Sequence, residues 1–256
     1  MPAVDKSLID ALERDGIVVV PSVLSSEEVL KLREELETAI AEDAVRYPDV
    51  FDKGMVHNCM VRGKNMARLL DNPVLNAYLS EAFSNTCIVY AYQSSSLAPG
   101  QKNYGSRVHV DSPRFIPGYA TNMGVIFPLD DFTEENGATY ALKGSHKTPE
   151  LPDNDFFFAN ATRGYCSAGD MILFNGRLVH AAGSNSTARA RHSLTINVCR
   201  SYMRQRFDFP RLVPGEVIDS LGENGKRLIG MDVRMPSSLE EFYLPEDQRL
   251  YKSNQG

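Results

Sequence analysis

A run of short β-rich segments, from about residue 86 to residue 200, constrains the fold of this chain more than any other feature. Turn-forming pairs such as Pro99-Gly100, Asn136-Gly137 and Ala168-Gly169 separate these segments. No helix of convincing length intervenes, so consecutive strands should pair antiparallel. We therefore predict a mainly β fold with flanking α-helices and a double-stranded β-helix core, the jelly-roll or cupin-like architecture. The expected strands are residues 87–93, 107–111, 121–129, 138–142, 170–174 and 193–200.

Helical signals precede the β-rich run. Residues 6–14 predict a short helix, and residues 17–20 predict a strand. Ser25 and Glu28 have the spacing of a capping box, which marks the start of a helix. One or two further helical segments are expected within residues 67–79. An apolar stripe at helical spacing follows the capping box: Val29, Leu32, Leu36 and Ile40.

The length of 256 residues suits one large β-rich domain. We therefore expect a single domain over residues 1–256. In it, helical elements at about 1–85 pack on the jelly-roll core at about 86–202, and an extension follows at about 203–256. A further helix is expected near residues 237–242.

Composition narrows the partners that such a protein can have. The formal net charge of −6 argues against a broad nucleic-acid face, which needs an excess of Lys and Arg. No apolar run approaches the roughly 18–20 residues that cross a bilayer, and the charged N-terminal segment lacks the apolar core of a secretory signal. The 4 cysteines form no CxxC pair and indicate reduced core thiols. We expect a cytoplasmic protein that binds a small molecule, without nucleic-acid or membrane partners.

The tripeptide His109-Val110-Asp111 is the strongest local pattern among the 5 histidines. Residues two apart on a strand face the same side, so the imidazole of His109 and the carboxylate of Asp111 would converge on one point. A histidine from another strand would complete a facial set that leaves three positions of an octahedral iron(II) open. Alone, the tripeptide is weak, because a solvated turn explains such a pattern more often.

The surroundings of His180 strengthen the metal hypothesis. His180 follows the apolar run 171–174 and the turn pair Asn175-Gly176, and Arg191 comes later, at the start of the strand expected at 193–200. If the two strands are neighbours, Arg191 can point a guanidinium into the barrel. A buried guanidinium needs a carboxylate partner, and the far carboxylate of 2-oxoglutarate offers a planar, two-pronged match.

Several ordered motifs make the chain similar to the phytanoyl-CoA dioxygenase family of iron(II)- and 2-oxoglutarate-dependent oxygenases. The likeness covers most of the chain, and it departs from the family at Lys143, where proline is usual, and at Ala182, where some relatives carry a hydroxyl. The motifs that carry it are DGIVVVP at 15–21, LSSEEV at 24–29, NGAT at 136–139, KGSHK at 143–147, GDMILF at 169–174 and VHAAGSN at 179–185.

The resemblance implies a set of site residues. His109, Asp111 and His180 would bind iron(II), and Arg191 would anchor 2-oxoglutarate, with O2 as the second co-substrate. Further contacts to 2-oxoglutarate would come from polar residues on otherwise apolar strands, and each of these could equally satisfy a backbone group. The two candidates are Gln93 and Asn122.

The remaining histidines have simpler explanations. His146 lies in a Gly-Ser-His turn and is expected to be structural, whereas His192 alternates with Arg191 and should face away from the centre. His57 more often covers a core than lines a substrate pocket. Four cations are candidates to meet an anionic substrate group, although a solvated face explains such charges more often: Arg62, Lys102, Arg107 and Arg114.

A complete set of two histidines and one carboxylate favours hydroxylation over halogenation, because halogenating relatives carry a small residue in place of the carboxylate. We therefore expect hydroxylation of an unactivated C–H bond in a small metabolite, such as a biosynthetic intermediate, with release of succinate and CO2. Desaturation and ring formation are alternatives. Two rival classes are a zinc or manganese hydrolase or isomerase, which would not need Arg191, and a non-catalytic jelly-roll binding module. Oligomeric state is left open.

Loops are expected to select the substrate, because binding residues in such folds concentrate there. The candidate segments are residues 51–64, 101–106, 113–119 and the tail after Tyr202.

Overall fold

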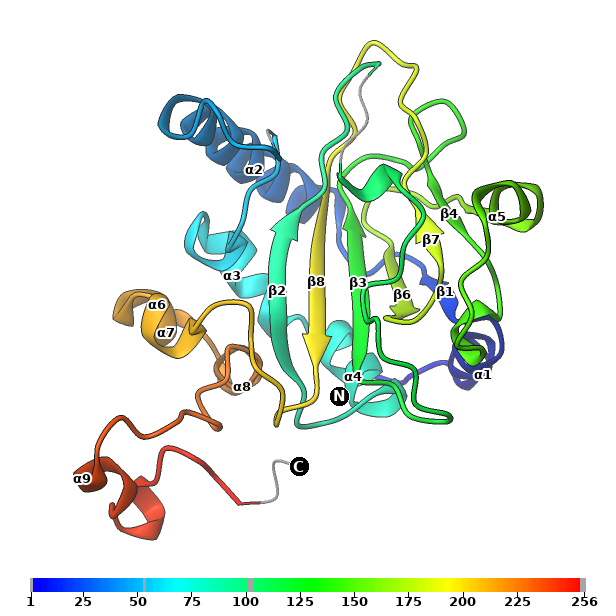
Figure 1. Cartoon of the computed structure of the whole chain (residues 1–256). Coiled ribbons are helices and arrows are strands. Elements are labelled where there is room, and N and C mark those ends of the chain that lie inside the picture. Colours follow the sequence, from blue (N-terminus) through cyan, green and yellow to red (C-terminus); the bar gives the residue numbers. More distant parts are fainter. Residues whose placement is uncertain (1, 53, 101–103, 254–256) are drawn as a thin grey trace.

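The structure is a computed structural model that describes residues 2–52, 54–100 and 104–253. Two antiparallel sheets form its centre (Figure 1). The larger sheet has the strand order β1 (Ile17–Val20), β6 (Met171–Asn175), β3 (Asn122–Pro128), β8 (Ser193–Cys199) and β2 (Ile88–Ser94). The smaller sheet has the order β5 (Thr162–Gly164), β4 (Thr139–Ala141) and β7 (His180–Ala181).

Helices cover one face of the larger sheet. Leu32 and Leu36 of α2 join the same apolar cluster as Val125 of β3 and Ile196 of β8, which alternate with residues on the opposite face. Arg33 of α2 also forms an ion pair with Asp130, at 2.6 Å, just after β3. The helices before the core are α1 (Lys6–Asp15), α2 (Ser26–Arg46), α3 (Lys64–Arg68) and α4 (Pro73–Ala82).

Local sequence signals account for the ends of these helices. The capping box predicted at the start of α2 is confirmed, since the Ser25 hydroxyl accepts from the Glu28 amide and the Glu28 carboxylate accepts from the Ser25 amide. Asn72 accepts from two amides at the start of α4. Gly16 ends α1 with φ 81°, the left-handed conformation that glycine adopts most easily.

The chain after β8 is helical and irregular. Its described helices are α6 (Phe209–Leu212), α7 (Gly215–Ser220), α8 (Glu223–Leu228) and α9 (Leu239–Phe242). Phe209, Leu221 and Leu228 are buried in the main apolar cluster, so most of this segment packs on the core. α9 lies within the helix expected near residues 237–242, and it projects from the body in Figure 1.

The predicted jelly-roll core with flanking helices is confirmed, but two details were wrong. Residues 107–111 do not form a strand, because His109 makes a single bridge to His180 of the two-residue strand β7 and the ladder goes no further. A helix, α5 (Asn154–Asn160), does interrupt the β-rich run. Its cap is Asp153 and it buries Phe157. Among the described residues, no helix is long and apolar enough to cross a membrane.

Candidate active site

Backbone pairing brings the two candidate histidines together. The amide of His109 donates to the carbonyl of His180, and the amide of His180 donates to the carbonyl of His109, each at 3.0 Å. Their ring centroids are 4.3 Å apart. Asp111 lies two residues beyond His109, and its Oδ1 is 3.6 Å from Nε2 of His109 and 3.9 Å from Nε2 of His180. Residues from two segments far apart in sequence therefore meet at one point.

The geometry of this cluster fits a metal ion. One ligand atom from each of His109, Asp111 and His180 lies within 4.8 Å of the others. Ligands about 2.1 Å from an octahedral ion stand about 3 Å apart on one face, so modest side-chain shifts close the set. Imidazole and carboxylate together suit iron(II), and the facial arrangement leaves the opposite side of the ion open.

Hydrogen bonds fix which nitrogen of each ring faces the site. Nδ1 of His109 lies 2.8 Å from the carbonyl of Arg107, and Nδ1 of His180 lies 3.0 Å from the carbonyl of Leu178. A carbonyl only accepts, so each neutral ring carries its proton on Nδ1. Both Nε2 atoms therefore present lone pairs to the site, as metal-binding histidines do.

Asp111 is oriented by a polar residue of the sheet. Nδ2 of Asn197 on β8 donates to Oδ2 of Asp111 at 3.0 Å. Asn122 of β3 in turn donates to Oδ1 of Asn197 at 3.2 Å, which holds the amide of Asn197 in place. Oδ1 of Asp111 is thus left to face the two imidazoles.

The charges of the cluster depend on burial and on each other. Burial lowers the pKa of His109, but the Asp111 carboxylate at 3.6 Å and the hydrogen bond to the Arg107 carbonyl outweigh it, so the pKa ends above its ordinary value. Burial lowers the pKa of His180. For Asp111, burial raises the pKa, but the two histidines and Asn197 outweigh it, and the pKa lies below its usual range. At neutral pH the carboxylate is ionised.

A cavity of about 290 Å³ opens beside the cluster, and Arg191 lines it together with all three residues. Arg191 is 2% exposed, its Nη1 donates to the carbonyl of Gly137 at 2.7 Å, and its guanidinium lies 4.2 Å from the centroid of the Phe132 ring. Its Nε is buried and has no partner among the described residues. Burial lowers the pKa of Arg191 to about 10, so the group remains a cation at neutral pH.

The structure separates the two tentative co-substrate contacts. Gln93 lines the cavity, and its Oε1 accepts from Nη1 of Arg206 at 3.0 Å. Asn122 is buried and is absent from the cavity wall, because Asn197 lies between it and Asp111. In this structure Asn122 supports Asn197, and its direct contact with 2-oxoglutarate stays a prediction.

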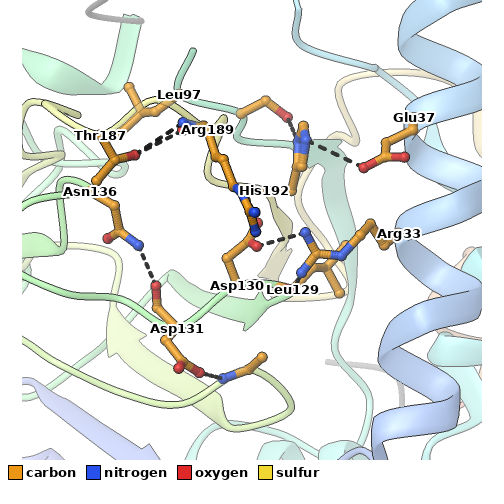
Figure 2. Close-up of polar contacts among 12 residues, drawn as sticks. Arg33, Glu37, Leu97, Leu129, Asp130, Asp131, Asn136, Thr187, Arg189 and His192 are labelled. Carbon is orange, nitrogen blue, oxygen red and sulfur yellow. Dashed lines mark hydrogen bonds and ion pairs between the residues drawn. The ribbon is translucent and has the colours of Figure 1, made fainter. Parts of the chain in front are cut away.

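The other histidines lie outside the cavity. His192 faces away from it, as its alternation with Arg191 indicated. Its Nδ1 meets the Ser96 hydroxyl at 2.8 Å and its Nε2 lies 3.9 Å from Glu37 of α2. Figure 2 shows His192 on the side that faces α2, near the ion pair of Arg33 with Asp130.

His146 fits the structural role expected for it, since its Nε2 meets the Glu13 carbonyl at 3.1 Å. His57 pairs with Asp52 at 2.5 Å and lines a second hollow of about 910 Å³, near α2.

The candidate cations have different surroundings. Arg107 lines the cavity beside His109, Asp111 and His180, which we call the iron cavity. Arg62 pairs with Asp43 at 2.7 Å and with Glu42 at 3.0 Å. Arg114 is exposed and lines neither hollow, and Lys102 lies outside the described residues.

Sequence reasoning missed Asn197 and Arg206. A signal for Asn197 was present, because Ser193, Thr195 and Asn197 alternate with the apolar residues of the strand. The structure places all three on the cavity wall, together with Arg191. Arg206 had no such signal, since it belongs to an irregular segment whose path depends on tertiary contacts.

A jelly-roll with two histidines and one carboxylate at one point, and a buried arginine in the same cavity, defines the class of non-haem iron oxygenases that use 2-oxoglutarate. The model of the phytanoyl-CoA dioxygenase (PhyH) family matches residues 12–193. The chain belongs to this family, and it is an iron(II)- and 2-oxoglutarate-dependent oxygenase.

Individual relatives are similar to most of the chain. The chain is 28% identical to Rv1501 of Mycobacterium tuberculosis over 96% of this chain and 94% of that protein. It is 28% identical to dioxygenase ALT11 of Alternaria alternata, over 88% of this chain and 81% of that protein. The crystal structure of the epimerase SnoN in complex with Fe3+, alpha ketoglutarate and nogalamycin RO is similar in fold, with a TM-score of 0.63, 21% identity and coverage of 82% of this chain and 90% of SnoN.

Proposed function

We propose that His109, Asp111 and His180 bind iron(II), that Arg191 binds the far carboxylate of 2-oxoglutarate, and that the enzyme hydroxylates a C–H bond of a small molecule. One oxygen atom of O2 would enter the substrate, and the other would enter the succinate formed as 2-oxoglutarate loses CO2. Bound iron supplies the activation of O2 in this chemistry. The observation that carries the proposal is the buried, under-partnered Arg191 in the same cavity as the three ligands.

Arg191 determines how a dicarboxylic acid would lie in the cavity. A buried guanidinium that keeps its charge is costly unless an anion meets it. Gly137 supplies only a neutral carbonyl, and Nε is left without a partner among the described residues. A carboxylate beside Arg191 would satisfy this donor and direct the other end of the acid toward the metal ligands.

The remaining wall supports this arrangement. Phe174 packs 5.0 Å from His180 between ring centroids, and with Phe132 and Ile126 it supplies apolar surface to the cavity. Such a lining limits the access of water to the metal side of the site. Gln93 remains a candidate contact to 2-oxoglutarate through its amide nitrogen, because Arg206 takes its oxygen.

Support for a small-molecule substrate comes from the shape of the site. The iron cavity adjoins the second hollow at Met55, which lines both. Together they give a concave, partly open site with additional space toward α2, which suits a compact metabolite better than a flat macromolecular surface. The SnoN complex contains a small molecule, nogalamycin RO, together with its iron and alpha ketoglutarate.

A metal screen tests the proposed function. Purified apoprotein is supplied with 2-oxoglutarate and O2 and with iron(II), manganese(II) or zinc(II) in turn, and succinate is measured. Of the three metals, we expect only iron(II) to support succinate formation. The rate should be slow, because the primary substrate is absent from the assay. Succinate formation that does not depend on iron(II) would contradict the proposed function, and no succinate with any of the three metals would favour the rival hydrolase or isomerase class.

A further inference from the structure

The C-terminal extension contributes a cation to the mouth of the iron cavity. The chain that leaves β8 runs back along β2 before it reaches α6 (Figure 1). The amide of Arg206 donates to the carbonyl of Tyr90 at 2.9 Å, and Nε2 of Gln205 donates to the carbonyl of Val89 at 2.8 Å. These contacts fix the segment against the edge strand. Arg206 is exposed, yet it lines the same cavity as the metal ligands.

Gln93 orients the Arg206 guanidinium without neutralising it. Nη1 of Arg206 donates to Oε1 of Gln93 at 3.0 Å, and Gln93 itself faces the cavity. No carboxylate of the described residues lies within ion-pair distance of Arg206. Nε and Nη2 of this side chain keep their donors available at the cavity mouth. An arginine held in this way is prepared for a planar anion.

When the site holds iron(II) and 2-oxoglutarate, none of its charges balances the positive charge of Arg206. In the proposed complex, iron(II) and Arg191 carry three positive charges, while Asp111 and 2-oxoglutarate carry three negative charges. Asp111 is the one carboxylate among the described residues of the cavity wall. The inner site is therefore neutral when loaded, and Arg206 adds a positive potential at its entrance, where Arg107 also lies.

We propose that the primary substrate carries an anionic group, a carboxylate or a phosphate, which Arg206 binds while Gln93 holds the guanidinium in place. This inference rests on the proposed function, because it assumes that Arg191 is taken by 2-oxoglutarate. Arg206 lies beyond residues 12–193, which the family model matches, so the contact belongs to the extension of this chain. The anion at Arg206 would fix one end of the substrate and leave an apolar part to reach the metal.

Binding of matched probes tests this assignment. The anaerobic complex of the protein with iron(II) and 2-oxoglutarate is titrated calorimetrically with three acids, benzoate, octanoate and benzyl phosphate, and with their uncharged counterparts, benzamide, octanamide and benzyl alcohol. At least one acid should bind tenfold or more tightly than its counterpart. Arg206→Gln should abolish this preference, Arg206→Lys should retain part of it, and Gln93→Leu should weaken it severalfold. Arg204→Gln, which removes the same charge two residues away and outside the cavity wall, should leave it unchanged.

The outcomes separate this inference from the proposed function. If Arg206→Gln binds 2-oxoglutarate as wild type does but loses the preference for acids, the inference stands. Equal binding of acids and counterparts by wild type, no binding of any acid, or an unchanged preference in Arg206→Gln would each overturn it. Loss of 2-oxoglutarate binding in Arg206→Gln would also overturn it, since Arg206 would then serve the co-substrate. Failure of wild type to bind 2-oxoglutarate at all would refute the proposed function instead.

Discussion

Arg191 is the residue whose environment is most difficult to explain without a ligand. Its side chain is buried and charged at neutral pH, and its one hydrogen bond to the described residues goes to a neutral carbonyl. A purely structural arginine in this position would be expected to have its remaining donors paired. The described wall of the cavity offers no carboxylate other than Asp111, which already faces His109 and His180.

Replacement of Arg191 should therefore separate co-substrate binding from metal binding. We expect Arg191→Ala to weaken 2-oxoglutarate binding by about 100-fold or more, because a charge-assisted pair in a buried site is lost, while iron(II) affinity stays within severalfold of wild type. Equilibrium dialysis with each ligand measures both. Arg189→Ala, at an exposed position two residues earlier, is the matched control. Wild-type 2-oxoglutarate affinity in Arg191→Ala would remove this residue from the site.

Asn197 should act on the metal rather than on 2-oxoglutarate. Its amide holds Oδ2 of Asp111, so Asn197→Ala frees the carboxylate to rotate. We expect iron(II) affinity to fall about 10- to 100-fold, the usual effect of losing a group that orients a metal ligand. Thr195→Ala, on the same strand and the same wall, should keep wild-type iron(II) affinity. Equal affinities in the two variants would show that Asn197 does not orient Asp111.

As pH falls, His109 should be protonated before His180, and this should release the metal. Protons compete with iron(II) for both imidazoles, and a raised pKa keeps His109 protonated at a higher pH than an ordinary histidine, whereas the lowered pKa of His180 leaves that ring neutral. As pH falls, apparent iron(II) affinity should begin to decline above the ordinary imidazole pKa of about 6.5, by about tenfold per pH unit for one proton. Anaerobic iron(II) titrations across this range measure it. A pH-independent affinity down to about pH 5 would contradict the ligand set.

At the scale of elements, the strands of the larger sheet could be predicted because their signals are local. Residues 122–128 and 193–199 are apolar, β-rich and bounded by turns, and the capping box fixed the start of α2. The segment around His109 could not be placed in the same way. Its extended pairing depends on β7, which is two residues long and lies far along the chain.

A glycine in β3 makes room for the packing behind His180. A Cβ at Gly124 would lie 2.0 Å from the tip of the Phe174 ring, which itself packs on His180. Gly124→Ala should therefore push Phe174 toward the metal ligands and lower the free energy of unfolding by about 1–3 kcal/mol, as overpacking usually does. Iron(II) affinity should fall as well. Chemical denaturation and metal titration measure the two effects, and the double variant Gly124→Ala with Phe174→Leu should recover part of the stability. An unaffected Gly124→Ala variant would show that Phe174 can move without cost.

At the scale of the whole molecule, the sheet order joins segments that no local pattern connects. β1, from the N-terminal part, pairs with β6, and β3 lies between β6 and β8. Of the segments expected to select the substrate, three reach the iron cavity, through Met55, Gly105 and Arg206, whereas residues 113–119 do not. The order of the motifs and the family resemblance predicted the three metal ligands from sequence. Asn197 and Arg206 could be recognised only from their contacts in three dimensions.

The most direct test of the account is an anaerobic visible titration. Iron(II) and then 2-oxoglutarate are added to wild type, to His180→Ala and to His57→Ala, a histidine variant outside the iron cavity. We predict a charge-transfer band that saturates at about one iron per chain in wild type and in His57→Ala, and that is absent or much weaker in His180→Ala. A band of equal strength in His180→Ala, or no band in a wild-type protein that has bound both iron(II) and 2-oxoglutarate, would contradict the account.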